Sequence, residues 1–366
     1  MKNILYSKPS IGDLEKQYVC DAIKNGWGES CYDYIYKFQD NYKDYLGVKH
    51  ALATSSCTGA LHIALKTIGV EAGDEVIVPD ATWVASVAPV TYLCAKPVFI
   101  DVLESTWCID PKKIEEAITP KTKAIIVVHL YGGMCEMDEI MEIAKKHNLY
   151  VIEDAAEAIG SEYKSKKAGS IGDFGVFSFH GTKTITTGEG GMLVTNNPDL
   201  FKAASILHDH GRDPKIEKTF WAEKVGFKYK ISNLQAALGF AQIQRVDELV
   251  NKKIEIFKMY KEELSGIDGI TINNTQEYVK NSYWMPTIVF NEKMGIDRDE
   301  FINTLNKQGI GARPFFYPVS SFPEFNTKSE NVISYKLSKH GVNLPSNFDI
   351  GINDIQFIGE CIKNGK

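Results

Sequence analysis

Residues 177–195 read FSFHGTKTITTGEGGMLVT, and this stretch decides the fold prediction. An apolar, β-prone run leads into a loop of small and polar residues that holds one lysine, Lys183, and a second β-prone run follows Gly188-Glu-Gly-Gly191. A lysine on a loop between strands can present its amine to a bound aldehyde. A surface lysine has the same pattern when it is taken alone. A nucleotide-phosphate loop is excluded, because glycine and lysine are not adjacent in Gly181-Thr-Lys-Thr184.

The chain upstream of this loop alternates short β-rich runs with helix-length amphipathic segments. The runs VIVP, AIIVVH and YVIED are almost continuously apolar, as expected for strands covered on both faces. This alternation predicts βαβ units and an α/β fold with a mainly parallel sheet between helices. The expected strands are 75–79, 97–101, 123–129, 149–153, 175–179 and 192–195.

Downstream of the loop the pattern changes to a long helical stretch, residues 233–264, with apolar residues at three- and four-residue spacing. Beyond it, a strand-like run at 285–290, a helix-like run at 297–308, the segment ARPFFYPV and a final helix from residue 353 indicate a smaller α+β domain. We therefore predict a large domain over residues 1–245 and a small C-terminal domain over residues 246–366.

The bulk composition excludes several classes of protein. The formal charge of −6 gives no general attraction to nucleic acid or to an anionic membrane. The seven cysteines are scattered without C-x-x-C spacing, and His208-Asp-His210 has no third ligand nearby, so neither a disulfide framework nor a metal site is expected. Without an apolar leader or an apolar run of ~18 residues, we expect a cytoplasmic protein with no membrane span.

Three further features could bind the same ligand as Lys183. Asp154 ends the strand-like YVIED, and ligands lie at the carboxyl ends of strands in open α/β sheets; a helix cap is the alternative. The hydroxyl-rich turn at residues 54–60 enters a helix whose N-terminus suits a phosphate group, although an ordinary cap has the same composition, and Ser178 could join it. Trp83 could stack on a flat ring or belong to the core.

Taken together, a lysine, an acid, an aromatic and a phosphate-binding turn fit pyridoxal 5′-phosphate (PLP). The chain also resembles the sugar aminotransferases of the DegT/DnrJ/EryC1/StrS family over nearly its whole length. This resemblance implies the aspartate aminotransferase-like fold (type I) of PLP enzymes. It rests on the loop quoted above and on GDEVIVPDATW, VIEDAAEAIGS, YKISNLQAALG, RPFFYPV and GVNLPS.

The resemblance implies a role for each matching position. Lys183 matches the lysine that bonds to the cofactor aldehyde and moves the proton, and Asp154 matches the partner of the pyridine nitrogen. Glu157 lies where the family places a residue near the phenolic oxygen, and Trp83 matches the ring-stacking position. The phosphate-binding positions are occupied by Ser56, Cys57, Thr58 and Ser178.

A second subunit completes the site in this family, so a homodimer with the site at its interface is implied. The family's Asn-Tyr-Arg before the LQAALG helix reads Lys228-Tyr229-Lys230 here, which keeps positive charge for the phosphate, and Asn233 follows as a further cofactor contact. The more common Ser-Asn-Gly-Thr turn reads Ser55-Ser56-Cys57-Thr58, a variant that should keep its backbone donors.

The predicted reaction transfers an amino group from glutamate to C4 of a nucleotide-diphosphate-linked 4-keto-6-deoxyhexose, as in the perosamine-forming branch that supplies polysaccharide biosynthesis. We expect His180, Arg313 and Tyr317 to contact this substrate. The alternatives are a C3-keto sugar or a non-nucleotide keto substrate. A PLP-dependent sugar dehydratase, which uses histidine in place of Lys183, and a non-catalytic homologue are further alternatives.

Overall fold

Seven strands form the main sheet of the computed structural model, which describes residues 3–213, 215–325 and 331–364. The strand order is β1-β9-β8-β5-β4-β2-β3, and β9 alone runs against the others in this sheet. The predicted α/β class with a mainly parallel sheet is therefore confirmed. The strands are β1 (His50–Thr54), β2 (Glu75–Pro79), β3 (Lys96–Ile100), β4 (Thr122–Val128), β5 (Tyr150–Asp154), β8 (Phe174–Ser178) and β9 (Gly191–Thr195).

The six strands predicted for this region are present, each within one residue of its predicted ends. The apolar runs of β2 and β4 are buried, because both strands have a neighbour on each side in the sheet and helices cover both faces. β1 was not predicted, since its sequence, HALAT, is short and gives no clear period. It pairs antiparallel with β9 at the edge of the sheet.

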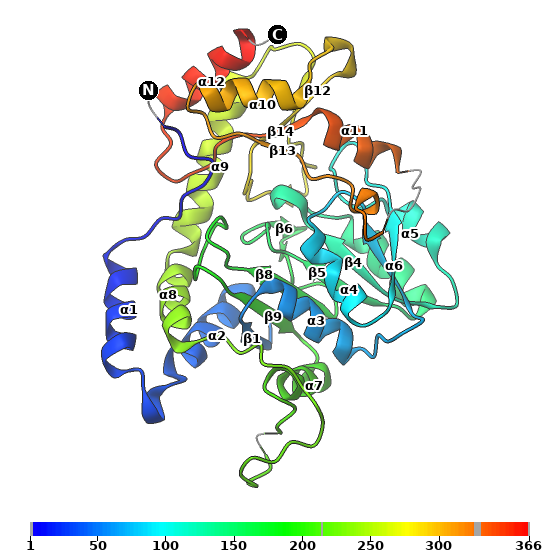
Figure 1. Ribbon diagram of the computed structural model, residues 1–366, viewed down its shortest axis with the longest axis vertical. Helices are drawn as coiled ribbons and strands as arrows, with labels where there is room; N and C mark the ends of the chain where they lie inside the picture. Colours follow the sequence, from blue (N-terminus) through cyan, green and yellow to red (C-terminus); the bar gives the residue numbers. More distant parts are fainter. Residues whose placement is uncertain (1–2, 214, 326–330, 365–366) are drawn as a thin grey trace.

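Helices surround the main sheet (Figure 1). One group, which consists of α1, α2 and α8, packs together beside the edge strand β1. Within the described part of the chain, none of the helices combines the length and the apolar composition that a bilayer span requires. The helices are α1 (Asp13–Asn25), α2 (Asp33–Leu46), α3 (Cys57–Thr67), α4 (Ala88–Tyr92), α5 (Pro111–Ala117), α6 (Met137–His147), α7 (Pro198–His208) and α8 (Asn233–Gln244).

The long helical stretch predicted at 233–264 is two helices, α8 and α9 (Val246–Glu263). They are separated at Arg245, whose backbone (φ −108°, ψ 7°) leaves the helical region. The guanidinium of Arg245 binds Glu15 of α1 at 2.7 Å and Glu248 at 2.8 Å. The sequence pattern misses this break because the apolar spacing continues across it.

α9 leads to a second, antiparallel sheet with the order β10-β12-β14-β13, at the top of Figure 1. This sheet and its helices enclose a second core, which also includes Ile4 from the start of the chain. The division of the chain at residue 245 stays a prediction. The elements are β10 (Ile270–Ile272), β12 (Thr287–Phe290), β13 (Arg313–Pro314), β14 (Gly341–Asn343), α10 (Arg298–Lys307), α11 (Val332–His340) and α12 (Ile352–Asn364).

A third sheet of three short strands was not predicted. β11 (Val279–Lys280) pairs with β6 (Glu162–Tyr163), which pairs with β7 (Lys166–Lys167). It joins the chain after β5 to the chain before β12, and so connects the two larger sheets next to the segment that leads to Trp284.

Candidate active site

A cleft of about 540 Å³ opens at the carboxyl ends of β4, β5 and β8, between the main sheet and segments that belong to the second sheet. This is the position that open α/β sheets favour for ligands. Ten of the residues selected from the sequence line it: Lys183, Asp154, Glu157, Trp83, Ser56, Cys57, Thr58, Ser178, His180 and Arg313.

Lys183 lies on the loop between β8 and β9, and its side chain is only 14% exposed. Its Nζ is 3.1 Å from Oε1 of Glu157 and 3.8 Å from the centroid of the Trp284 ring. The indole Nε1–H of Trp284 donates to the carbonyl of Thr182, the residue before Lys183, at 2.9 Å. The amine is thus held inside the cleft by a carboxylate and an aromatic face, unlike a surface lysine.

Glu157 is buried, and burial raises the pKa of its carboxyl group, while the charge of Lys183 opposes this rise. Its second oxygen, Oε2, accepts a hydrogen bond from the backbone N–H of Tyr131 at 2.9 Å. Tyr131 adopts a left-handed conformation with φ of 52°, an uncommon one for a bulky residue. Such strain often marks a functional site, and here it aims an amide at Glu157.

Asp154 is the last residue of β5, and its carboxylate is buried beneath the cleft. Ser86 donates its hydroxyl to Oδ2 at 2.7 Å, the amide of Ala156 donates to Oδ1 at 3.1 Å, and the Cys57 thiol is 3.9 Å from Oδ1. Burial raises the pKa of Asp154, and the hydrogen bonds from Ser86 and Ala156 oppose this rise. The group therefore both caps the local turn and faces the cleft, where it suits a protonated ring nitrogen.

The hydroxyl-rich turn is the N-terminus of α3, as predicted. Ser56 is the N-cap and accepts a hydrogen bond from the amide of Gly59 at 3.0 Å. A side chain on Gly191 of β9 would lie 2.6 Å from the backbone nitrogen of Cys57, so glycine is needed for this close approach. The positive end of the α3 dipole and the hydroxyls of Thr58 and Ser178 make this end of the cleft suitable for a phosphate.

Aromatic rings also line the cleft. Trp83 is 55% exposed, and its ring lies 6.1 Å from that of Phe316. Arg313 is 5.0 Å from the ring of Tyr6, which also lines the cleft. The sequence analysis selected Trp83, and it selected Arg313 with the aromatic residues beside it, among which Phe316 lines the cleft. It missed Tyr6 and Trp284, because their segments lie far from the lysine loop in sequence. It also missed Thr82, Ser86 and Tyr131, whose roles depend on the fold.

Lys228 and Lys230 do not line the cleft of their own chain. Both bind Asp209, Lys228 at 3.3 Å and Lys230 at 2.7 Å, and Arg212 binds the same carboxylate at 2.7 Å. Burial of Asp209 disfavours its charged form. The hydrogen bond from Lys230 and the positive charges of Lys230, Lys228 and Arg212 outweigh this cost, and they hold the pKa of Asp209 well below its usual range. The cluster keeps an excess of positive charge outside the cleft.

Asn233 and Tyr317 also lie outside the cleft. The amide of Asn233 donates to the carbonyls of Gly26 and Ser30, both at 3.3 Å, and thereby fixes the connection between α1 and α2. Tyr317 accepts a hydrogen bond from Arg298 at 3.1 Å, in a separate depression. Within one chain, the structure brings His180 and Arg313 to the cleft and leaves Tyr317 out.

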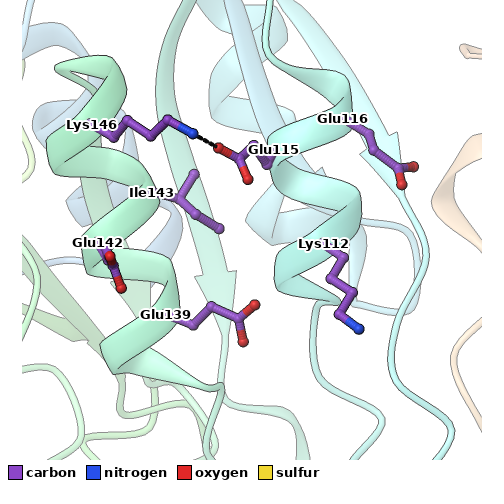
Figure 2. A pocket seen from close by; sticks show the side chains of 7 residues that line it. All are labelled: Lys112, Glu115, Glu116, Glu139, Glu142, Ile143 and Lys146. Atoms are coloured by element: carbon purple, nitrogen blue, oxygen red, sulfur yellow. Dashed lines mark hydrogen bonds and ion pairs between the residues drawn. The ribbon is translucent and has the colours of Figure 1, made fainter.

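A further depression lies between α5 and α6 (Figure 2). Its side chains are mostly charged, and Lys146 of α6 reaches across to Glu115 of α5 at 2.5 Å. It shares no residue with the cleft around Lys183. The arrangement is that of two solvated helix faces joined by an ion pair.

Comparisons with known proteins agree on one family. A model of the DegT/DnrJ/EryC1/StrS aminotransferase family matches residues 9–363. GDP-perosamine synthase of Escherichia coli O157:H7 is 40% identical over 363 residues, which cover 99% of this chain and 98% of that protein. GDP-perosamine synthase of Caulobacter vibrioides is 40% identical over 358 residues, 97% of this chain and 96% of that protein.

Solved structures agree with this result. Spr1654 from Streptococcus pneumoniae, described as a sugar aminotransferase, superimposes with a TM-score of 0.91 at 28% identity. The match covers 100% of this chain and 98% of that one. It has been solved with PLP and with the amino form of the cofactor, pyridoxamine phosphate.

Proposed function

The chain belongs to the DegT/DnrJ/EryC1/StrS aminotransferase family and is a PLP-dependent sugar transaminase, and on this premise we propose its substrates. The amino group passes from glutamate to C4 of a 4-keto-6-deoxyhexose linked to a nucleotide diphosphate. Near-complete coverage at 40% identity to two GDP-perosamine synthases is the observation that carries this proposal. It favours GDP-4-keto-6-deoxymannose as substrate and a product that serves polysaccharide biosynthesis.

The donors around the cleft fit PLP. The buried carboxylate of Asp154 would hold the ring nitrogen, the exposed face of Trp83 would cover the ring, and Lys183 would bond to the aldehyde. The phosphate would lie at the N-terminus of α3, near Ser56, Cys57, Thr58 and Ser178. When bound, PLP supplies an electron sink that stabilises negative charge on the substrate carbon next to nitrogen.

Lys183 is the group proposed to move the proton at that carbon. Its Nζ lies inside the cleft and donates to Glu157 at 3.1 Å. Glu157 orients the amine and, through the amide of Tyr131, is itself held in place. A general base positioned in this way commonly contributes about 10²- to 10⁴-fold to the rate.

The mouth of the cleft supports a substrate that carries negative charge and a flat or apolar face. Arg313 is exposed there and offers a cation to a diphosphate, and His180 is also exposed. Trp83 and Phe316 offer ring faces for a sugar or a base. We assign His180 and Arg313 to substrate contact on this basis.

A homodimer is part of the proposal. The segment 215–226, here called the arm, extends beyond α7 at the bottom of Figure 1, and Phe220 (99%), Val225 (94%) and Trp221 (47%) are exposed on it. Large apolar side chains exposed on one short segment favour a role in a protein interface. The positions of Lys228 and Lys230, outside the cleft of their own chain, support a role at the partner's site.

The cysteines are consistent with a reducing, cytoplasmic location, which we also propose. None of the seven forms a disulfide. Cys57, Cys108 and Cys135 are buried as free thiols.

The substrate proposal is tested with purified enzyme, glutamate and a matched panel of GDP-, UDP- and dTDP-linked 4-keto-6-deoxyhexoses and 3-keto isomers. The product is identified by NMR, which separates amination at C4 from amination at C3. Turnover with GDP-4-keto-6-deoxymannose to a 4-amino sugar is expected. Amination at C3, or turnover of a non-nucleotide ketone alone, would replace the proposal with the corresponding alternative.

A further inference from the structure

The indole ring of Trp284 lies against the amine of Lys183. The distance of 3.8 Å from Nζ to the ring centroid is well within the ~6 Å reach of a cation–π interaction. The same nitrogen is 3.1 Å from Glu157. Because Trp284 and Glu157 are both almost fully buried, the ammonium lies in a small enclosure between a carboxylate and an aromatic face.

We propose that Trp284 is a positioning residue which, together with Glu157, holds the ammonium group of Lys183 whenever this lysine is not bonded to the cofactor. The inference rests on the role proposed for Lys183 above. In a transaminase the lysine is free while the cofactor carries the amino group. The ring therefore stabilises that half of the cycle and keeps the amine near the position where it acts.

Contacts other than the one with the Lys183 amine hold the ring of Trp284 in place. Its Nε1–H donates to the carbonyl of Thr182, and its own carbonyl accepts from the hydroxyl of Ser346 at 3.1 Å. The ring of Tyr131 stacks beside it, with centroids 6.1 Å apart. The ring is thus held in place, so it loses little freedom of its own when the ammonium of Lys183 packs against it.

Trp284 also connects the two larger sheets. It lies between β11 and β12, in the segment that leads into the second sheet, whereas Lys183 and Glu157 lie on loops that follow strands of the main sheet. Ser346, which holds Trp284, is itself bound by Lys253 of α9 at 3.0 Å. The second sheet therefore supplies a wall of the site, and not only a cover.

The expected effect is on an equilibrium, which a purely structural tryptophan would not move. A cation–π interaction changes an equilibrium constant by about twofold when it is exposed to solvent and by about thirtyfold when it is desolvated. Loss of the ring should therefore shift the balance from the pyridoxamine phosphate form toward the PLP form by this factor. Phenylalanine keeps an aromatic face and should restore part of it.

The test compares Trp284→Leu, Trp284→Phe and wild type. Each protein is mixed with a graded series of glutamate and 2-oxoglutarate ratios, and the absorbance bands give the fractions of the two cofactor forms at equilibrium. Trp107→Phe is the matched control, because Trp107 is an equally buried indole that packs on Phe315. We expect a two- to thirtyfold shift for W284L, a smaller one for W284F and none for W107F.

Equal equilibrium constants between the two cofactor forms in wild type, W284F and W284L would overturn the inference. A shift of this constant in W107F as large as that in the Trp284 variants would also overturn it. If W284L fails to fold, W284F against W107F decides the outcome. Borohydride treatment of the same samples separates the two proposals. Cofactor trapped on Lys183 with unchanged constants refutes the role of Trp284 alone, whereas wild type without such a trapped adduct refutes the role of Lys183 and the inference with it.

Discussion

Replacing Ser86 by alanine should make cofactor binding depend more strongly on pH. Ser86 donates to Oδ2 of Asp154 at 2.7 Å, and the carboxylate is buried. A hydrogen bond to a charged group contributes about 1.5–3 kcal/mol. Since about 1.4 kcal/mol is tenfold in an equilibrium constant, its loss disfavours the ionised form of Asp154 by about ten- to a hundredfold and raises the pKa further.

The sign of the effect follows from which form binds the cofactor. PLP needs the carboxylate of Asp154, so the apoenzyme must lose a proton before binding wherever the pH is below the pKa of this group. The pKa is already raised by burial, and S86A raises it more. At the alkaline end of the pH range, where both apoproteins hold a carboxylate, they should bind PLP almost equally. As the pH falls, the variant should bind PLP progressively more weakly than wild type, by up to about ten- to a hundredfold.

The assay measures the dissociation constant of PLP from the apoproteins between pH 5.5 and 9.5, followed by the appearance of the yellow band. Ser320→Ala is the matched control, because Ser320 also donates to a buried carboxylate, Asp80, at 2.7 Å, outside the cleft. It should cost similar stability and leave PLP binding unchanged. A loss in S86A that is equal at pH 6 and pH 9.5, or no loss, would refute the assignment of Asp154.

Three other predictions concern stability and assembly. Without cofactor, the Asp154→Asn variant should melt at a higher temperature than wild type at pH 8. The pKa of Asp154 is raised in the folded protein, so its ionised form lowers stability at pH values above ~3.9, the ordinary pKa of an aspartate. The gain should vanish near pH 4, and equal melting curves at pH 8 would contradict it. Burial lowers the pKa of Lys253 to about 7, against ~10.4 in the unfolded chain, so urea unfolding of wild type should show stability rising from pH 7 to 10. Lys253→Met should lack this rise, and the same slope in both proteins would exclude Lys253 as its source. Phe220→Asp should weaken dimerisation at least tenfold in sedimentation experiments, since burying a phenylalanine contributes about 1.5–3 kcal/mol; an unchanged dissociation constant would remove the arm from the interface.

Much of the main sheet could be predicted from the sequence. Buried parallel strands such as β2 and β4 are continuous apolar runs bounded by polar turns, so their position is clear within one residue. β1 and the short strands β6, β7 and β11 were missed, because two to five residues at an edge leave no period. The break at Arg245 was missed for a different reason. The apolar pattern does not change there, and the break is accompanied by ion pairs of Arg245 with Glu15 and Glu248.

Part of the candidate site could also be predicted from the sequence, and part could not. Residues on the lysine loop, at the end of β5 and at the start of α3 are recognisable because each carries its chemical group at a strand or helix end. Ser86 and Trp284 could not be selected, because a serine and a buried tryptophan are common and their roles depend on contacts with Asp154 and Lys183. Tyr317 was selected from its neighbours in sequence, and it lies outside the cleft against Arg298.

The central claim, that Lys183 is the residue that bonds to PLP, is tested most directly by borohydride reduction followed by peptide mass spectrometry. The account predicts a single cofactor adduct on the peptide that contains Lys183. It also predicts that Lys183→Ala gives no adduct and loses transamination. An adduct on another lysine, or full turnover by the K183A variant, would contradict the account.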